Sequence, residues 1–257
     1  MKNRLTKLFE QKKSNVLNIY CTAGYPQLNS TMEVMRSLQK NGADIIELGM
    51  PYSDPLADGP VIQQSSNTAL ANGMTMELLF GQLKYLRNEI QLPVILMGYM
   101  NPVLQYGFER FCAAAAAVGI DGIILPDLPM HEFEIEYKTV LEKYRLYFIF
   151  LVTPETGEER IRKIDELCSG FIYAVSSSST TGQSKPIEDQ QPYFKKLHDM
   201  QLKNPVMAGF GIGDKAAFNA ACRHCTGAII GSAYIRALQN SGDIERSTKE
   251  FLNRILD

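Results

Sequence analysis

The chain has 257 residues, of which 45% are hydrophobic and 21% charged, and its formal net charge is −2. This balance gives no reason to expect a nucleic-acid or anionic-membrane partner. No apolar run approaches the ~20 residues that a membrane-spanning helix needs. The five cysteines are an odd number, and the N-terminal residues lack the apolar core of a signal peptide. We therefore expect reduced thiols and a cytoplasmic protein.

Short apolar runs alternate with amphipathic stretches along the chain. After a short basic helix at the N-terminus, the expected strands are residues 16–21, 44–48, 93–97, 122–125, 147–152, 171–175, 205–208 and 227–230. The expected helices between them include residues 30–41, 76–89, 108–118, 131–144, 158–167 and 215–222. Eight strand–helix units without a linker predict a single α/β domain over residues 1–257, a closed (β/α)8 TIM barrel. An open doubly wound sheet is the alternative, which the lack of a G-x-G-x-x-G motif after the first strand disfavours.

Two intervals between strands are longer than the rest. The segment after the second strand contains ELGMPYSDPLADGP at residues 47–60, and the segment after the sixth contains SSSSTTGQSK at residues 176–185. Both long loops would lie at the carboxyl-terminal mouth of a barrel, where such folds hold their active sites. The small, polar composition of residues 176–185 suits a lid over a ligand, and it equally suits a plain flexible loop.

Glu47 stands out in the second strand. Alternation places Glu47 on the same face as Ile45 and Gly49, whereas the opposite face is wholly apolar and suits packing against helices. Glu47 therefore points toward the barrel axis. A carboxylate buried there is costly unless it is paired, protonated or acting on a ligand. Burial also raises its pKa toward the range of a general acid, so we favour catalysis over a structural ion pair.

Two aspartates, Asp54 and Asp58, follow on the proline-rich loop. Asp58 lies between Pro55 and Pro60 and precedes Gly59, a composition that is also typical of a solvated turn. Spacing alone does not decide which aspartate faces a ligand.

Glycine-containing turns follow the last two strands. The seventh strand ends in AGFGIG at residues 208–213, and the eighth ends in Gly231-Ser232 before a helix. Barrels often bind phosphate at these two loops. Glycine allows close approach of the backbone, and the N–H groups at a helix N-terminus favour an anion. The pattern predicts a phosphorylated ligand held by backbone amides without a basic cluster.

Cys222 and Cys225 form a C-x-x-C pair around His224. There is no second pair of ligands at zinc-like spacing, and the pair does not follow a thioredoxin-like strand. We expect no metal site.

These motifs are similar to those of the tryptophan synthase α-subunit family, and the resemblance spans nearly the full chain. The most specific match is the strand-2 signature IELGMPYSDPLADGP. The others are TAGYP at 22–26, MGYMNP at 97–102, LPDLP at 125–129, GFGI at 209–212 and IGSA at 230–233.

The resemblance implies a lyase of tryptophan biosynthesis that cleaves indole-3-glycerol phosphate to indole and glyceraldehyde 3-phosphate. This retro-aldol reaction uses no metal or organic cofactor. Glu47 corresponds to the acid–base residue, and Asp58 to the carboxylate that binds the indole N–H and stabilises the charge developing there. The substrate-binding positions implied are Tyr20, Ile62, Tyr173 and Thr181, and the phosphate-binding positions are Gly182, Phe210, Gly211, Gly231 and Ser232.

The resemblance also implies a partner, the pyridoxal-phosphate-dependent β subunit, in an α2β2 complex to which indole passes directly. Pyridoxal phosphate is expected only in that β subunit. The family docks through the loops after strands 2 and 3, here around Asp54, Pro55, Asn101 and Pro102.

The lid departs from the family pattern. Many relatives carry a sequence like SRSGVTG where this chain has SSSSTTG, so Ser177 and Ser179 replace an arginine and a glycine. We expect the activity to remain, while lid dynamics and coupling to a partner would differ. The alternatives are a free-standing indole-producing lyase and a non-catalytic activator of the β subunit. The intact Glu47 and Asp58 disfavour the second alternative.

Overall fold

A parallel sheet forms the centre of the molecule. The computed structural model describes residues 2–175, 187–239 and 242–257. The strands are β1 (Val16–Thr22), β2 (Ile45–Gly49), β3 (Val94–Met97), β4 (Gly122–Ile124), β5 (Tyr147–Phe148), β6 (Leu151–Val152), β7 (Ile172–Val175), β8 (Val206–Gly209) and β9 (Gly227–Ile230). Their order in the sheet is β5-β4-β3-β2-β1-β9-β8-β7-β6, and every pair is parallel.

The two ends of this sheet meet in one stretch of chain. β5 pairs with β4 and β6 pairs with β7, yet only Ile149 and Phe150 separate β5 from β6. These two residues continue the ladder, because the Ile149 N–H donates to the Ile123 carbonyl and the Phe150 carbonyl accepts from the Tyr173 N–H. The expected strand at residues 147–152 is thus divided at the closing seam. The sheet closes as the predicted (β/α)8 barrel.

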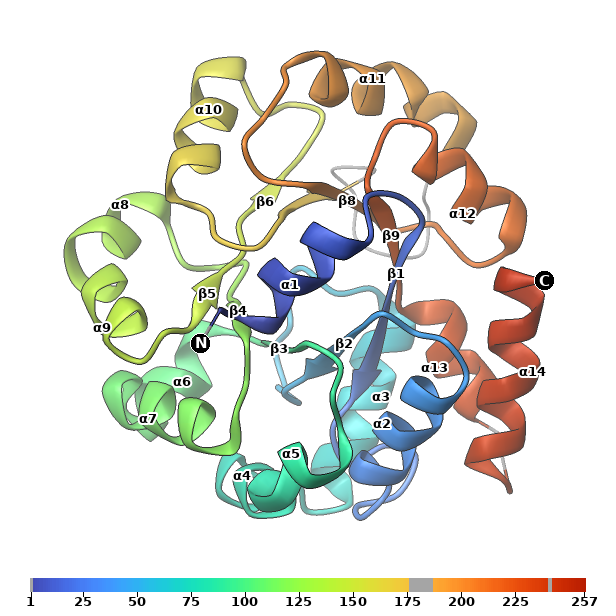
Figure 1. The fold of residues 1–257 in the computed structure, drawn as a ribbon. Coiled ribbons are helices and arrows are strands. Elements are labelled where there is room, and N and C mark those ends of the chain that lie inside the picture. The colour runs from blue at the N-terminus through green and yellow to red at the C-terminus, as the bar shows by residue number, and fades with distance from the viewer. Residues whose placement is uncertain (1, 176–186, 240–241) are drawn as a thin grey trace.

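All the helices but α1 (Arg4–Gln11), which lies at one end, surround the barrel on its outer side (Figure 1). The others are α2 (Thr31–Lys40), α3 (Pro60–Ala71), α4 (Met76–Gln82), η1 (Leu83–Tyr85), α5 (Leu86–Glu89), α6 (Met100–Tyr106), α7 (Phe108–Val118), α8 (Met130–Glu132), η2 (Phe133–Tyr137), α9 (Lys138–Lys143), α10 (Glu158–Leu167), η3 (Ile187–Gln190), α11 (Gln191–Asp199), α12 (Lys215–Cys222), α13 (Ser232–Gln239) and α14 (Ile244–Leu256). None of the helices in the described ranges is long and apolar enough to cross a membrane.

The N-terminal helix α1 lies across the amino ends of the strands, in front of the sheet in Figure 1. The side chain of Leu5 is fully buried, and the ring of Phe9 meets that of Phe171 edge-on at a centroid distance of 6.1 Å. The Asn3 side chain donates to the Asp121 carbonyl just before β4. Because α1 covers this end, a ligand has access from the opposite, carboxyl end.

The long segment between β2 and β3 contains the helix α3 in addition to the expected helical region at residues 76–89. Gly59 caps α3, and Pro60 occupies its first turn, where the missing N–H costs no hydrogen bond. The buried residues of α3 include Ile62 and the small polar Ser65 and Ser66. This packing fixes Asp58, which precedes the cap residue Gly59, against the top of the barrel.

Candidate active site

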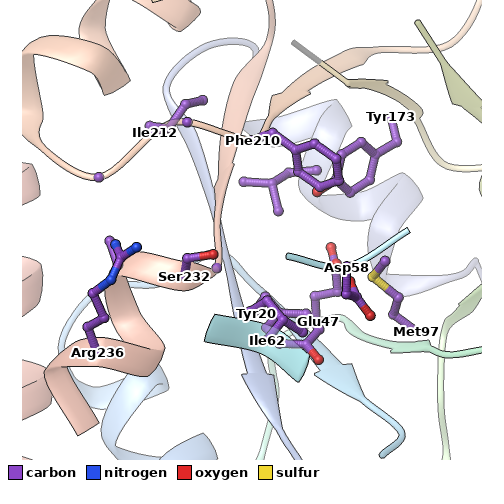
Figure 2. Close-up of a pocket in the computed structure, with 15 residues that line it drawn as sticks. Tyr20, Glu47, Asp58, Ile62, Met97, Tyr173, Phe210, Ile212, Ser232 and Arg236 are labelled. Carbon is purple, nitrogen blue, oxygen red and sulfur yellow. The ribbon is translucent and has the colours of Figure 1, made fainter. Parts of the chain in front are cut away.

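A cavity opens at the carboxyl ends of the strands, and most of the predicted site residues line it. These are Tyr20, Glu47, Asp58, Ile62, Tyr173, Phe210, Gly211, Gly231 and Ser232. Glu47 and Asp58 lie at one end of the cavity, and Ser232 lies toward the other (Figure 2). Thr181 and Gly182, and the departures at Ser177 and Ser179, fall outside the described residues.

Glu47 projects from β2 into the barrel and is only 1% exposed. Its Oε2 accepts a hydrogen bond of 2.8 Å from the side-chain amide of Asn18 on β1. Burial raises the pKa of Glu47 to about 8, with a further increase from the charge of Asp58, while the hydrogen bond from Asn18 opposes the rise. Glu47 is therefore a carboxylic acid that can give up its proton near neutral pH.

Asp58 is held at the end of the proline-rich loop. Its N–H donates to the Pro55 carbonyl in a turn, and its own carbonyl accepts from the Gln63 side chain of α3. Its Oδ2 accepts a hydrogen bond of 2.9 Å from the Tyr99 hydroxyl. Burial raises the pKa of Asp58 to about 6, and the bond from Tyr99 limits the increase. At pH 7 Asp58 is mainly ionised, whereas Glu47 is mainly protonated.

Tyr20 and Tyr173 give the cavity two aromatic rings beside these carboxyl groups. Burial raises the pKa of each hydroxyl well above its usual value, so both remain neutral. Each ring lies over a glycine of the neighbouring strand. A Cβ at Gly49 would lie 2.0 Å from the Tyr20 hydroxyl oxygen, and one at Gly209 would lie 2.3 Å from the Tyr173 ring. The two glycines therefore make room for the rings that shape the cavity.

The far end of the cavity is formed by the loops after β8 and β9. Phe210 and Gly211 have φ angles of 71° and 70°. This conformation is costly for phenylalanine, on the order of 1–3 kcal/mol, and it turns the backbone after β8 sharply. Opposite this turn, Ser232 begins α13, whose first N–H groups have no partner within the helix. The two loops create a concave backbone surface that suits an anion.

Asn18, Met97, Tyr99 and Arg236 are among the lining or supporting residues that the sequence did not predict. Arg236 lies one turn after Ser232 on α13 and lines the same cavity, beside Ser232 in Figure 2. Helical spacing from Ser232 was a usable signal for it. Alternation with Tyr20 along β1 was a usable signal for Asn18. Tyr99 lies within the MGYMNP motif, but nothing in that motif indicates a contact with Asp58.

The predicted partner-contact residues lie on a neighbouring surface. Asp54, Asn101 and Pro102 line a cleft together with Tyr52, whose hydroxyl accepts a hydrogen bond of 3.0 Å from the Asn101 side chain. Pro55 is buried. Its neighbour Leu56 is instead 86% exposed, so Leu56 is the apolar side chain that this loop presents outward.

Metal-ligating side chains do not gather in the described part of the chain, where no group of three or more histidine, cysteine or acidic residues is placed to hold an ion. Cys222 is partly exposed, Cys225 is buried, and both are free thiols. Burial raises the pKa of each thiol, to about 11 and about 12, respectively, which makes them poor nucleophiles and ligands.

The closed barrel and the paired carboxyl groups at its carboxyl end define a (β/α)8-barrel enzyme of the acid–base type. A family model described as "Tryptophan synthase alpha chain" matches residues 6–255. The chain is 49% identical to the tryptophan synthase alpha chain of Parabacteroides distasonis, over 99% of this chain and 98% of that one. It is 51% identical to that of Flavobacterium johnsoniae, over 98% and 99%.

Solved structures agree. The alpha subunit of Legionella pneumophila tryptophan synthase superimposes with a TM-score of 0.90 at 33% identity, covering 99% of this chain and 97% of that one. A mutant alpha subunit from the hyperthermophile Pyrococcus furiosus gives 0.85 at 32% identity, covering 95% and 99%. The chain belongs to the tryptophan synthase alpha chain family, the lyase component of an enzyme of tryptophan biosynthesis.

Proposed function

We propose that this chain cleaves indole-3-glycerol phosphate to indole and glyceraldehyde 3-phosphate. The observation that supports this most strongly is the placement of two buried carboxyl groups, Glu47 and Asp58, in one cavity, where burial raises their pKa values to about 8 and about 6. A retro-aldol cleavage needs a proton donor that becomes a base, and a separate negative charge that remains in place. The two carboxyl groups have environments that divide these roles between them.

The reaction begins with proton transfer from the Glu47 carboxyl to ring carbon C3 of the indole. The ring nitrogen then carries the positive charge, and its N–H donates to the Asp58 carboxylate. The Glu47 carboxylate next takes the proton of the hydroxyl on the carbon attached to C3. The oxygen electrons form the aldehyde C=O, the C–C bond breaks, and its electron pair neutralises the ring. Glu47 ends the cycle protonated, and no metal or organic cofactor takes part.

The cavity suits the two ends of this substrate. Tyr20, Ile62 and Met97 supply apolar and aromatic surface near the carboxyl groups, which suits an indole ring. Gly211, Gly231 and Ser232 would bind the phosphate, with backbone N–H groups and a hydroxyl that donate hydrogen bonds to its oxygens. Arg236 would add one positive charge.

We further propose that the chain works with a β subunit in an α2β2 complex, and that pyridoxal phosphate belongs to that subunit alone. The exposed Leu56 and the cleft formed by Tyr52, Asp54 and Asn101 provide an apolar and polar docking surface beside the active site. The strand-2 loop would then serve both catalysis and contact.

The test is an assay of indole release from indole-3-glycerol phosphate by the purified chain, alone and with a tryptophan synthase β chain. We expect indole in both cases and a faster rate in the complex. A rate that the β chain leaves unchanged would favour a free-standing lyase. No indole under either condition would refute the proposed reaction.

A further inference from the structure

Asn18 is an unusual residue in the barrel interior. It is fully buried on β1, where it is aligned with Ile45 of β2 and Ile229 of β9. In this apolar setting a leucine of similar size would need no hydrogen bond. The amide instead reaches up to Glu47, which lies two positions further along β2.

The Asn18 amide is only half satisfied. Its NH2 group donates to Glu47 Oε2, whereas its carbonyl Oδ1 is buried without a hydrogen-bond partner in the described structure. Native proteins rarely leave a buried polar atom unpaired, and each case calls for a reason. The group that the amide contacts, Glu47, has a chemistry that bears on this.

An acid–base residue exists in two forms with opposite hydrogen-bonding needs. A carboxylate only accepts, whereas a carboxylic acid also donates, and an asparagine amide offers both a donor and an acceptor. A half-turn about the Cβ–Cγ bond of Asn18 exchanges the NH2 group for the carbonyl at the same place. The unpaired Oδ1 is the group that the protonated form of Glu47 would use.

Building on the proposed function, we propose that Asn18 is the positioning residue of Glu47: its NH2 group holds the carboxylate, and its carbonyl, after rotation, holds the acid. The Glu47 carboxyl thereby keeps its orientation while its proton leaves and returns. A lysine at this site would instead favour the charged form alone.

The other groups near Glu47 do not provide this partner. Tyr20 and Cys21 of β1 and Tyr173 of β7 lie close enough for the charge of Glu47 to raise their pKa values, but among the hydrogen bonds of the described residues the one to the Glu47 side chain comes from Asn18. From the loop after β2, Asp58 supplies negative charge and is hydrogen-bonded to Tyr99. Asn18 is thus the hydrogen-bonded partner that can follow the proton on Glu47.

The first test is Asn18→Leu, which removes both halves of the amide at similar volume. We expect kcat for indole release to fall about 10- to 100-fold, the equivalent of a lost hydrogen bond to a charged group, with KM within about threefold of wild type. The high-pH limb of kcat/KM should move to higher pH, because the carboxylate loses a stronger, charge-assisted bond than the acid does.

The matched control is Thr248→Val, another buried polar residue made apolar, on α14 and hydrogen-bonded to the Tyr234 hydroxyl and the Ile244 carbonyl. It should lower stability without moving the pH limb. The proposal would be overturned if Asn18→Leu also lost only stability. Its kcat would then equal that of wild type, and the high-pH limb of its kcat/KM profile would not move.

A second measurement needs only the wild-type fold. In protein labelled with 15N-asparagine, the side-chain amide signal of Asn18 should shift as pH passes through the Glu47 pKa of about 8, and Glu47→Gln should abolish that shift. An Asn18 signal that stays constant across this range would overturn the proposal. If the wild type releases no indole, the proposed function fails, while the titration still tests the Asn18–Glu47 pair.

Discussion

The Tyr99 hydroxyl joins the two loops that frame the site. It donates a hydrogen bond of 2.9 Å to Oδ2 of Asp58 and accepts one of 3.1 Å from the Ala57 N–H. The Tyr99 ring also packs on that of Tyr52, with centroids 5.5 Å apart. One side chain after β3 therefore fixes the carboxylate on the loop after β2 and contacts the cleft proposed for the partner.

Tyr99→Phe should raise the pKa of Asp58 above its present value of about 6, because the bond that opposes the effect of burial is lost. The low-pH limb of kcat/KM for indole release should move to higher pH, with a loss of about tenfold at pH 6, in line with one hydrogen bond to a charged group. The control is Tyr52→Phe, which removes the neighbouring hydroxyl that contacts Asn101 instead. Equal shifts in both variants would contradict a specific role for Tyr99.

The value of kcat/KM for indole release should follow a bell-shaped pH profile. The proposed cycle starts with Glu47 protonated and Asp58 ionised, and their pKa values of about 8 and about 6 define the range in which both conditions hold. Below that range Asp58 gains a proton, and above it Glu47 loses one. Values of kcat/KM between pH 5 and 10 report these groups in the free enzyme. A rate that continues to rise through pH 9 would exclude Glu47 as the initial proton donor.

Glu47 should also make stability depend on pH. Its pKa in the folded chain, about 8, exceeds its ordinary value of 4.5. The folded state therefore keeps a proton that the unfolded state releases, and stability falls as pH rises from about 4.5 to about 8. Relative to Glu47→Gln, wild type should lose a few kcal/mol across this range, at ~1.4 kcal/mol per pKa unit. Urea unfolding at several pH values measures this loss. A difference between wild type and Glu47→Gln that stays constant across this range would contradict the raised pKa.

Arg236→Gln should weaken binding of the phosphate end of the substrate. Loss of a cation beside Ser232 should raise KM for indole-3-glycerol phosphate about tenfold, the scale of one charge-assisted bond, and leave kcat nearly unchanged. Inhibition by glycerol 3-phosphate measures the same contact without catalysis. Arg223→Gln, at an exposed arginine outside the cavity lining, is the control. An unchanged inhibition constant in Arg236→Gln would place the phosphate elsewhere.

Periodicity in the sequence predicts the barrel well, because each buried strand is a short apolar run and the order of units fixes the topology. The helices at residues 108–118, 158–167 and 215–222 agree with α7, α10 and α12. Helix α3 was not anticipated. Its buried face includes Ser65 and Ser66, so the apolar period is weak, and its start at Pro60 looks like part of the preceding turn. The division of the strand at residues 147–152 depends on which neighbour each half meets at the seam, which is a tertiary property.

The candidate site, like the fold, was predicted in part from the sequence. Alternation along β2 places Glu47 inside the barrel, and the glycine turns mark the anion-binding end. Asp58 and Asp54 are not distinguished by spacing, and only the fold shows that Asp58 is buried while Asp54 is exposed. The contacts from Asn18 and Tyr99 join residues 29 and 41 positions apart in the chain. No local pattern encodes such pairs.

The most direct test of the account is indole release from indole-3-glycerol phosphate by wild type and by Glu47→Gln, with glycerol 3-phosphate inhibition measured in both. We predict that wild type forms indole, that Glu47→Gln loses at least about 10²-fold in kcat, the scale of general acid–base catalysis, and that the inhibition constant changes little. Turnover by Glu47→Gln close to that of wild type would contradict the assignment of Glu47 as the acid–base residue.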